Sequence, residues 1–206
     1  MSSDPLHGQD FIYPVLQEPS HKTIFHNDKI DIYAVHFASG ERTFYHKHTR
    51  DQVGIVLRTS RWLDQKPGAP EQERKSFRGT LSFLPHTATG GITHRVIAVD
   101  EFWVMAIEFA KPAGPSAQRA AAGLDQTDLE FPQGAVKRVT IEPRASLEIP
   151  GSLMVTMSPV RLKDADTGAV WLSPEGSVKW IGDGSARTYV NDSQEPASLV
   201  VLSIAG

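Results

Sequence analysis

The feature that most constrains the fold is the alternation of short β-branched and aromatic runs with turns that contain Gly or Pro. Such runs occupy residues 22–25, 29–37, 52–57, 79–84, 94–99 and 102–109, and then 137–143, 145–149, 153–162, 169–172, 176–181, 187–190 and 197–204. No amphipathic helical run separates them, and 16 Gly and 14 Pro suit short strands joined by turns. The pattern predicts an all-β chain built as an antiparallel barrel or sandwich.

The pattern is interrupted once, by a segment rich in Pro, Gly and Ala. We therefore predict an N-terminal β domain over residues 1–112, a linker over 113–136 with a short helical patch, and a second β domain over 137–206. The segments that begin at Gly79, His94 and Trp103 are paralleled by those at Gly176, Ala186 and Leu199. This similarity indicates a degenerate internal repeat.

Composition excludes several kinds of function. The chain has no cysteine, so disulfides, thiolate metal sites and a cysteine nucleophile are absent. Its 21 basic and 24 acidic residues give a net charge of −3 without a basic run, which disfavours nucleic acid as a partner. No apolar stretch is long enough to span a bilayer and no leader is evident, so we expect a soluble cytoplasmic protein with no membrane partner.

Histidine is distributed unevenly along the chain. All eight histidines lie within the first 94 residues, so the chemistry is expected in the first domain, with the second as a scaffold or interface. His46 and His48 alternate with Lys47, and on an extended strand both imidazoles point to one face, close enough to hold one ion. Gly40 lies six residues before His46, Gln52 lies four residues after His48, and the later series Gly79, Pro85, Gly91, His94 completes a specific combination.

This combination resembles the two motifs of the cupin superfamily. The resemblance covers residues 30–109, and the second half resembles a cupin only as a metal-free second copy. It implies a cupin-type antiparallel β-barrel, that is, a double-stranded β-helix or jelly roll, in two tandem copies. It also implies that His46, His48, Gln52 and His94 occupy the four metal-ligand positions.

The sequence departs from the family pattern at four places. Gln52 stands where the family has a glutamate, Thr59 replaces a glycine, Ala98 replaces an asparagine, and the five residues 86–90 are inserted between Pro85 and Gly91. The missing carboxylate puts the fourth ligand in question. Asp51 is adjacent, but the strand period places it on the opposite face from Gln52.

Three imidazoles and an amide leave the charge of a divalent ion uncompensated, which favours an anionic, chelating substrate. The ligand set resembles that of three-histidine cupin dioxygenases that act on thiols or β-diketones. We therefore expect one divalent transition metal, with Fe(II) favoured and Zn, Ni or Mn as alternatives, and an Fe(II) dioxygenase as the leading function.

Three further residues are candidates for the site. Arg58 shares the parity of Gln52 and could bind a substrate carboxylate, although a solvent-facing role is the alternative. Tyr45 and His86 could move protons, and His86 could instead be a solvated loop residue.

Two other functions stay open at this point. A redox-neutral isomerase or lyase would use the metal to polarise a carbonyl, with Tyr45 or His86 as the base. A non-catalytic barrel would bind a small molecule, with the second half available for a homodimer.

Overall fold

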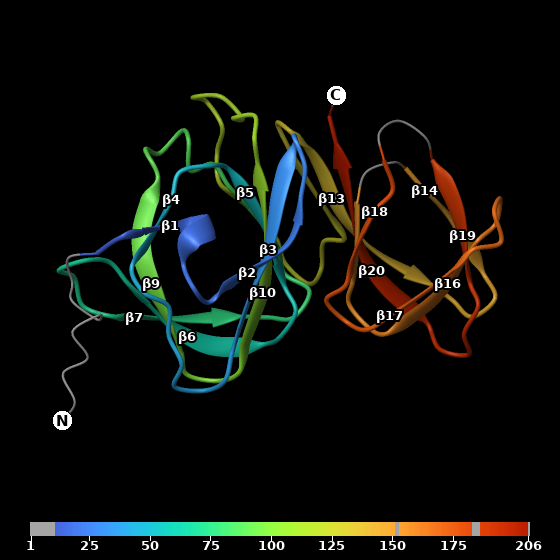
Figure 1. Cartoon of the computed structure of the whole chain (residues 1–206), viewed down its shortest axis with the longest axis horizontal. Helices are drawn as coiled ribbons and strands as arrows, with labels where there is room; N and C mark the ends of the chain where they lie inside the picture. Colours follow the sequence, from blue (N-terminus) through green and yellow to red (C-terminus); the bar gives the residue numbers. More distant parts are fainter. Residues whose placement is uncertain (1–10, 151–152, 183–185, 206) are drawn as a thin grey trace. The chain divides into compact units, whose positions relative to one another are not determined.

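The computed structural model describes residues 11–150, 153–182 and 186–205. The chain divides into two compact units, Met1–Ala121 and Ala122–Gly206. In Figure 1 the blue-to-green strands of the first unit curve around an interior, and so do the orange-to-red strands of the second. The described residues contain no helix with the length and apolar character needed to cross a membrane.

The first unit consists of two sheets. One has the order β1-β4-β9-β6-β7, with strands β1 (Tyr13–Pro14), β4 (His46–His48), β9 (Ile92–Ala98), β6 (Ser60–Gln65) and β7 (Gln72–Ser76). The other has the order β11-β8-β5-β10-β3-β2, with strands β11 (Ala120–Ala122), β8 (Leu81–Leu84), β5 (Gln52–Val56), β10 (Phe102–Phe109), β3 (Ile30–Phe37) and β2 (His21–His26). The short 3-10 helix η2 (Val15–Gln17) follows β1.

The second unit also consists of two sheets. One has the order β12-β13-β20-β15-β18, with strands β12 (Asp128–Phe131), β13 (Gly134–Ile141), β20 (Ala197–Ile204), β15 (Leu153–Thr156) and β18 (Val178–Trp180). The other has the order β14-β19-β16-β17, with strands β14 (Ser146–Ile149), β19 (Arg187–Asn191), β16 (Val160–Asp164) and β17 (Val170–Ser173).

The two units share one strand order. The series β4-β9-β6-β7 corresponds to β14-β19-β16-β17, and β8-β5-β10-β3-β2 corresponds to β18-β15-β20-β13-β12. The sequence segments that parallel each other form β8 and β18, β9 and β19, and β10 and β20. The internal repeat therefore agrees with the topology, and the structure contains two β-barrels of the same design.

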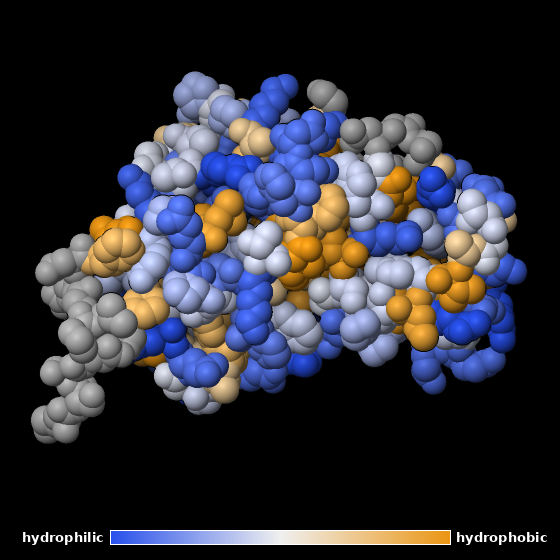
Figure 2. Space-filling view, in the orientation of Figure 1, coloured by the Kyte–Doolittle hydropathy of each residue, from blue (hydrophilic) through white to orange (hydrophobic). Residues whose placement is uncertain are grey.

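Each barrel has its own apolar core. In the first, one cluster of buried residues comprises Val15, Tyr33, Val35, Phe37, Val96, Ala98, Phe102 and Ala106. In the second, the cluster comprises Ile141, Ile149, Met154, Val160, Leu162, Ile181, Tyr189, Ala197, Leu199 and Val201. Hydrophilic residues cover most of the surface visible in Figure 2. Burial of alternate residues on facing sheets thus stabilises each barrel separately.

Three segments differ from the sequence-based expectation. Residues 113–136, predicted as a linker with a helical patch, contain β11, β12 and the start of β13. The polar segment 66–75, which lies outside the predicted strand runs, contains most of β7, an edge strand whose side chains are largely exposed. The single run 153–162 forms two strands, β15 and the first part of β16. Charged edge strands escape apolar pattern rules because they lie at the margin of a sheet.

Candidate metal centre

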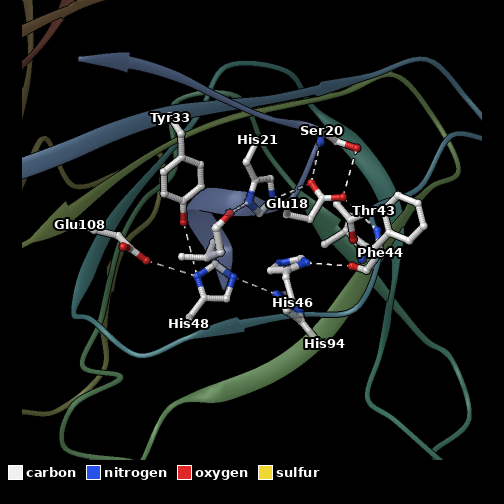
Figure 3. A network of polar contacts seen from close by, with 12 residues as sticks. Glu18, Ser20, His21, Tyr33, Thr43, Phe44, His46, His48, His94 and Glu108 are labelled. Atoms are coloured by element: carbon white, nitrogen blue, oxygen red, sulfur yellow. Dashed lines mark hydrogen bonds and ion pairs between the residues drawn. The ribbon is translucent and has the colours of Figure 1, made fainter. Parts of the chain in front are cut away.

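Three histidines meet inside the first barrel because two paired strands carry them on one face. β4 buries His46 and His48 and exposes Lys47 between them. β9 pairs with β4 in antiparallel register, which places His94 opposite His46. One nitrogen from each of the three imidazoles lies within 4.8 Å of the other two (Figure 3). The structure therefore brings together the three histidines that the sequence predicts as ligands.

Two of these imidazoles are oriented by a contact at their outer nitrogen. His46 Nδ1 lies 2.9 Å from the carbonyl oxygen of Phe44, and His94 Nδ1 lies 2.7 Å from Asp64 Oδ1. Both acceptors select the tautomer with hydrogen on Nδ1, which leaves the Nε2 lone pair free. Metal-bound histidines are oriented in this way, by a carbonyl or carboxylate on the other ring nitrogen.

The inner nitrogens provide a test of whether these residues fit a metal ion. His48 Nε2 and His94 Nε2 are 3.2 Å apart. With Nδ1 of His94 hydrogen-bonded to Asp64, its Nε2 has no hydrogen and presents a lone pair toward His48. Converging imidazole lone pairs are the donor set that a divalent transition metal prefers. The donor set therefore fits a divalent ion held by His46, His48 and His94.

Burial keeps His46 and His48 in the neutral form. Removal from water, together with the nearby His94 and His21, lowers the pKa of His46 to about 2. Burial, followed by the neighbouring His46, holds the pKa of His48 well below its usual value. Neutral imidazole is the form that binds metals, so the protein environment disfavours the proton as a competitor.

Gln52, the predicted fourth ligand, lies beside His48 on β5 and lines the same cavity. Its Oε1 accepts a hydrogen bond of 3.1 Å from the Tyr33 hydroxyl, which is also 3.4 Å from His48 Nδ1. Asp51 faces away, as the strand period predicts, and accepts hydrogen bonds from Thr87 and from the amide of Ala113. Gln52 is thus fixed next to the three histidines by Tyr33.

Glu108, a buried carboxylate behind His48, was not predicted from the sequence. Glu108 is 0% exposed, and its Oε1 lies 3.7 Å from His48 Nδ1. It shares a face with Gln52, since the two residues are register partners across β5 and β10. Burial raises the pKa of Glu108 to about 7, while Arg50 opposes that change. The signal in the sequence is one acid in the apolar run FWVMAIEF.

His21 and Glu18, which support the other side of the centre, were not predicted either. The His21 ring centroid lies 4.6 Å from that of His46, and its Nδ1 contacts the carbonyl oxygen of Val15 at 2.8 Å. Glu18 is 1% exposed and accepts a hydrogen bond of 3.0 Å from the amide of Phe44. The carbonyl oxygen of Phe44 orients His46. By holding Phe44 in place, Glu18 therefore helps to orient His46.

His86 lies at the centre, as the sequence allows. Its ring stacks on that of His48 with centroids 5.2 Å apart, and it is 8% exposed. Its buried Nε2 has no hydrogen-bond partner among the described residues. Burial, with a smaller contribution from the nearby His94, lowers the pKa of His86 to about 4. The inserted residues 86–90 therefore bring an additional neutral imidazole against a ligand.

Arg58 lies away from the centre, which agrees with the solvent-facing alternative and not with the inward position. Its guanidinium is 5.5 Å from the Trp103 ring centroid, and its Nε is 3.5 Å from Glu101 Oε2. The amides of Leu57 and Arg58 both donate to the carbonyl oxygen of Trp103, so two residues that follow β5 lie opposite a single residue of β10. Such a bulge reverses the side-chain alternation and turns Arg58 outward.

Tyr45 also fails to reach the cavity. It precedes His46, and the period that directs His46 inward directs its neighbour to the other face. There its ring packs against the guanidinium of Arg95, 5.0 Å from the ring centroid. Tyr45 is buried but does not line the cavity among the described residues.

The three histidines line a cavity of about 380 Å³ in the first barrel. Much of its wall is apolar and comes from residues on β3, β5, β9 and β10, including Val35, Val56, Val96, Phe102 and Val104. Positive charge comes from Arg74 and Arg119, which also line a smaller adjoining pocket with His86. The cavity therefore combines the four imidazoles of His21, His46, His48 and His94 with two guanidinium groups, the Lys75 ammonium and an apolar wall.

Comparison with known proteins gives similarity in structure alone. No protein-family model and no curated protein matches the sequence. AerE from Microcystis aeruginosa has a TM-score of 0.62 at 10% identity, over 92% of this chain and 99% of that one. A point mutant of the Bacillus subtilis oxalate decarboxylase OxdC has a TM-score of 0.54 at 12% identity, over 86% and 70%. A cupin 2 conserved barrel domain protein from Leptotrichia buccalis has a TM-score of 0.53 at 11% identity, over 90% and 88%.

The chain has a cupin fold. The matches to OxdC and to the Leptotrichia protein extend over both barrels, since each covers more than four fifths of the chain. The cupin fold and the three-histidine cluster together indicate a divalent metal without specifying which one.

Proposed function

We propose that the first barrel of this cupin is a metal-dependent enzyme site for a small anionic substrate, with Fe(II) as the ion and dioxygenation as the reaction. The observation that carries the proposal is the inward convergence of three imidazoles, two of which are fixed at Nδ1 by Phe44 and Asp64. When bound, such an ion supplies an electrophilic centre with open coordination positions, and iron adds redox chemistry with dioxygen.

The protein groups select the charge of the substrate. Neutral ligands leave the charge of a divalent ion uncompensated, and Arg74 and Arg119 add positive charge to the same cavity. A carboxylate, enolate or thiolate is stabilised in this field, whereas a cationic substrate is repelled. The buried Glu108 lies near Nδ1 of His48, whereas Nε2 of His48 lies near His94. Its negative charge therefore faces His48 and does not repel an anionic substrate on the side of His94.

The remaining wall orients the substrate and excludes water. The apolar side chains of Val35, Val56 and Phe102 accept the uncharged part of the molecule. Tyr33 holds Gln52 beside the three histidines, where its amide nitrogen can donate a hydrogen bond to an oxygen atom of the substrate. The substrate that fits is therefore a small molecule with an anionic chelating end and an apolar end, such as a thiol or a β-diketone.

A second candidate reaction follows from His86. Its buried and unpartnered Nε2, next to His48, can accept a proton from a substrate held in the cavity. A redox-neutral isomerisation or elimination needs such a base, and it does not need dioxygen. Among the two bases that the sequence offered for this reaction, the geometry favours His86 over Tyr45.

The test begins with metal content per chain, measured on protein purified without a tag or chelator. His46→Ala is the loss variant, and His36→Ala is the matched control because His36 stacks on Trp103 away from the cavity. We expect near-stoichiometric metal that is lost only in His46→Ala. Little metal in the wild type after anaerobic Fe(II) addition would leave a non-catalytic binding barrel.

Oxygen dependence then separates the two reactions. For the dioxygenase, Fe(II)-loaded protein consumes dioxygen in the presence of a small thiol or β-diketone, and zinc does not replace iron. For the redox-neutral enzyme, turnover continues without dioxygen, zinc supports it, and His86→Gln abolishes it while metal content is unchanged.

A further inference from the structure

The second barrel has a cavity of its own, of about 300 Å³. The cavity lies among β16, β17, β18 and β19, the strands that correspond to β6, β7, β8 and β9 of the first barrel. Its polar and aromatic lining includes Asp164, Trp171, Lys179, Trp180, Arg187 and Tyr189. No group in the described part of this barrel could hold a metal ion through His, Asp or Glu. The cavity therefore differs in chemistry from the three-histidine centre.

Lys179 places a cation on the inner face of this barrel. Its register partner on β15 is Met154, a fully buried core residue, so the two side chains share the inner face. The ammonium nitrogen lies 5.5 Å from the Trp171 ring centroid. No carboxylate of the described residues pairs with it. Lys179 thus provides a positive charge that no acidic side chain in the described barrel neutralises.

The only acid among the described residues that line the cavity is already fully hydrogen-bonded. Asp164 Oδ1 accepts from the amides of Asp166 and Thr167 at 3.0 and 2.9 Å, and Oδ2 accepts from Arg187 Nη1 at 3.2 Å. Arg187 uses one of its five N–H donors on Asp164 and keeps the others available. With one carboxylate against an ammonium and a guanidinium, the described lining of the cavity carries one net positive charge.

Aromatic rings form the remaining recognition surface. Trp171 and Trp180 line the cavity together with Tyr189, which is 1% exposed. The Tyr189 hydroxyl makes no hydrogen bond to any described residue, so it is available to a ligand in the cavity as a donor. Indole and phenol rings bind flat apolar groups through their faces and edges.

From these groups we infer that the second barrel binds a small planar monocarboxylate, with the carboxylate at Lys179 and Arg187 and the ring against Trp171. One anionic charge neutralises the cavity, and a guanidinium with an ammonium is suited to a carboxylate. A volume of about 300 Å³ is at the lower end of ligand pockets, which restricts the ligand to a single small ring. This site is independent of the metal centre in the first barrel.

Benzoate is the probe for this site, and the full metal-free chain is titrated by calorimetry and by tryptophan fluorescence. We expect saturable one-site binding that benzyl alcohol, the uncharged analogue, does not reproduce. Lys179→Met weakens the binding by about tenfold or more. Lys163→Met is the matched control, because Lys163 lies on the exposed face of β16 and its removal leaves binding unchanged. Trp171→Phe reduces the fluorescence change.

Two further variants keep the test decisive. Lys179→Gln retains a polar side chain and replaces Lys179→Met if that variant does not fold, with the same loss expected. His46→Ala removes a metal ligand from the first barrel and leaves benzoate binding unchanged. The inference is overturned if the wild type shows no saturation at millimolar benzoate, if benzyl alcohol binds equally well, if neither Lys179 variant weakens binding, or if His46→Ala abolishes it.

Discussion

The two barrels share a strand order but differ in what they bury. The first buries polar groups at its centre, among them His21, His46, His48 and Glu108. In the second, the strands that correspond to β4 and β9 direct Leu147, Ile149 and Tyr189 inward, and they belong to or pack against the apolar core. The comparison indicates that the fold does not require the histidines. Their burial is a cost that function explains, because buried polar groups stabilise only when they are satisfied.

The largest expected difference between the barrels is in their response to acid. Burial lowers the pKa of both His21 and His86 from 6.5 to about 4. Between pH 6.5 and pH 4 the unfolded chain therefore binds more protons than the folded barrel, and stability falls as the pH falls. Each of these histidines removes about 2 kcal/mol from the free energy of unfolding by about pH 5.

Glu108 acts in the opposite sense, because its pKa is raised from 4.5 to about 7 and the folded state holds its proton more tightly in that range. The stabilisation that Glu108 adds as the pH falls offsets the loss of stability from about one of these histidines. His46, with a pKa lowered to about 2, adds to the loss of stability. Hydrogen exchange of metal-free protein should show β4 and β9 losing protection between about pH 6.5 and pH 5, while β14 and β19 keep theirs. Equal losses in both barrels would contradict this assignment.

Metal removal is the next largest effect, and it should also separate the barrels. A ligand that binds only the folded state stabilises it by about 2.7 kcal/mol when its concentration is about a hundred times the dissociation constant. We expect a chelator at neutral pH to lower the unfolding free energy of the first barrel by about that amount and to leave the second unchanged. Urea titration followed by exchange in each barrel measures both. A uniform change across the two barrels would show that the ion does not bind in the first alone.

A smaller effect is expected from the carboxylate behind His94. Asp64→Asn weakens the acceptor at His94 Nδ1, and loss of such an outer contact reduces metal affinity by about ten- to a hundredfold. Asp164→Asn, in the corresponding sheet of the second barrel, is the matched control and should leave metal affinity unchanged. Competition with a chromophoric chelator gives both constants. Indistinguishable affinities for wild type and Asp64→Asn would remove Asp64 from the site.

The smallest effect is expected at the residue that the bulge turns outward. Arg58→Ala should change the free energy of unfolding by less than about 1 kcal/mol and should not affect substrate binding, since the side chain lies on Trp103 and Glu101. Arg74→Ala should weaken binding of an anionic substrate, because Arg74 lines the cavity. The Michaelis constants of Arg58→Ala and Arg74→Ala, measured with the same substrate, show which arginine contacts the substrate. An equal rise in both constants would place Arg58 in the substrate site.

The sequence contains enough information for most of the strands and for the three histidines that meet in the first barrel. Alternation in His46-Lys47-His48 fixes the face of both imidazoles, and the spacing to His94 adds the third. The alternation of residues along a strand does not predict side-chain directions that depend on local backbone geometry. A two-residue bulge after β5 reverses the parity of Arg58, and nothing in the composition of that strand marks it.

The residues that surround the ligands are harder to predict, because they come from distant segments. His21 and Glu18 precede β4 by more than twenty residues, and their contacts with His46 and Phe44 depend on how β1, η2 and β2 pass the sheet edge. Glu108 was visible as an acid in an apolar run, but its partner His48 is defined only by the pairing of β10 with β5.

The segment from Tyr13 to Glu18 contacts β4 and the residues next to it at several points. It contributes none of the three histidines of the centre. Tyr13 pairs with His46 in the parallel β1–β4 ladder, Val15 holds His21 through its carbonyl, and Glu18 holds the amide of Phe44. Substitutions in this segment can therefore adjust how firmly an ion is held while the cavity wall stays the same. Metal affinity and substrate specificity can then evolve separately, through different parts of one barrel.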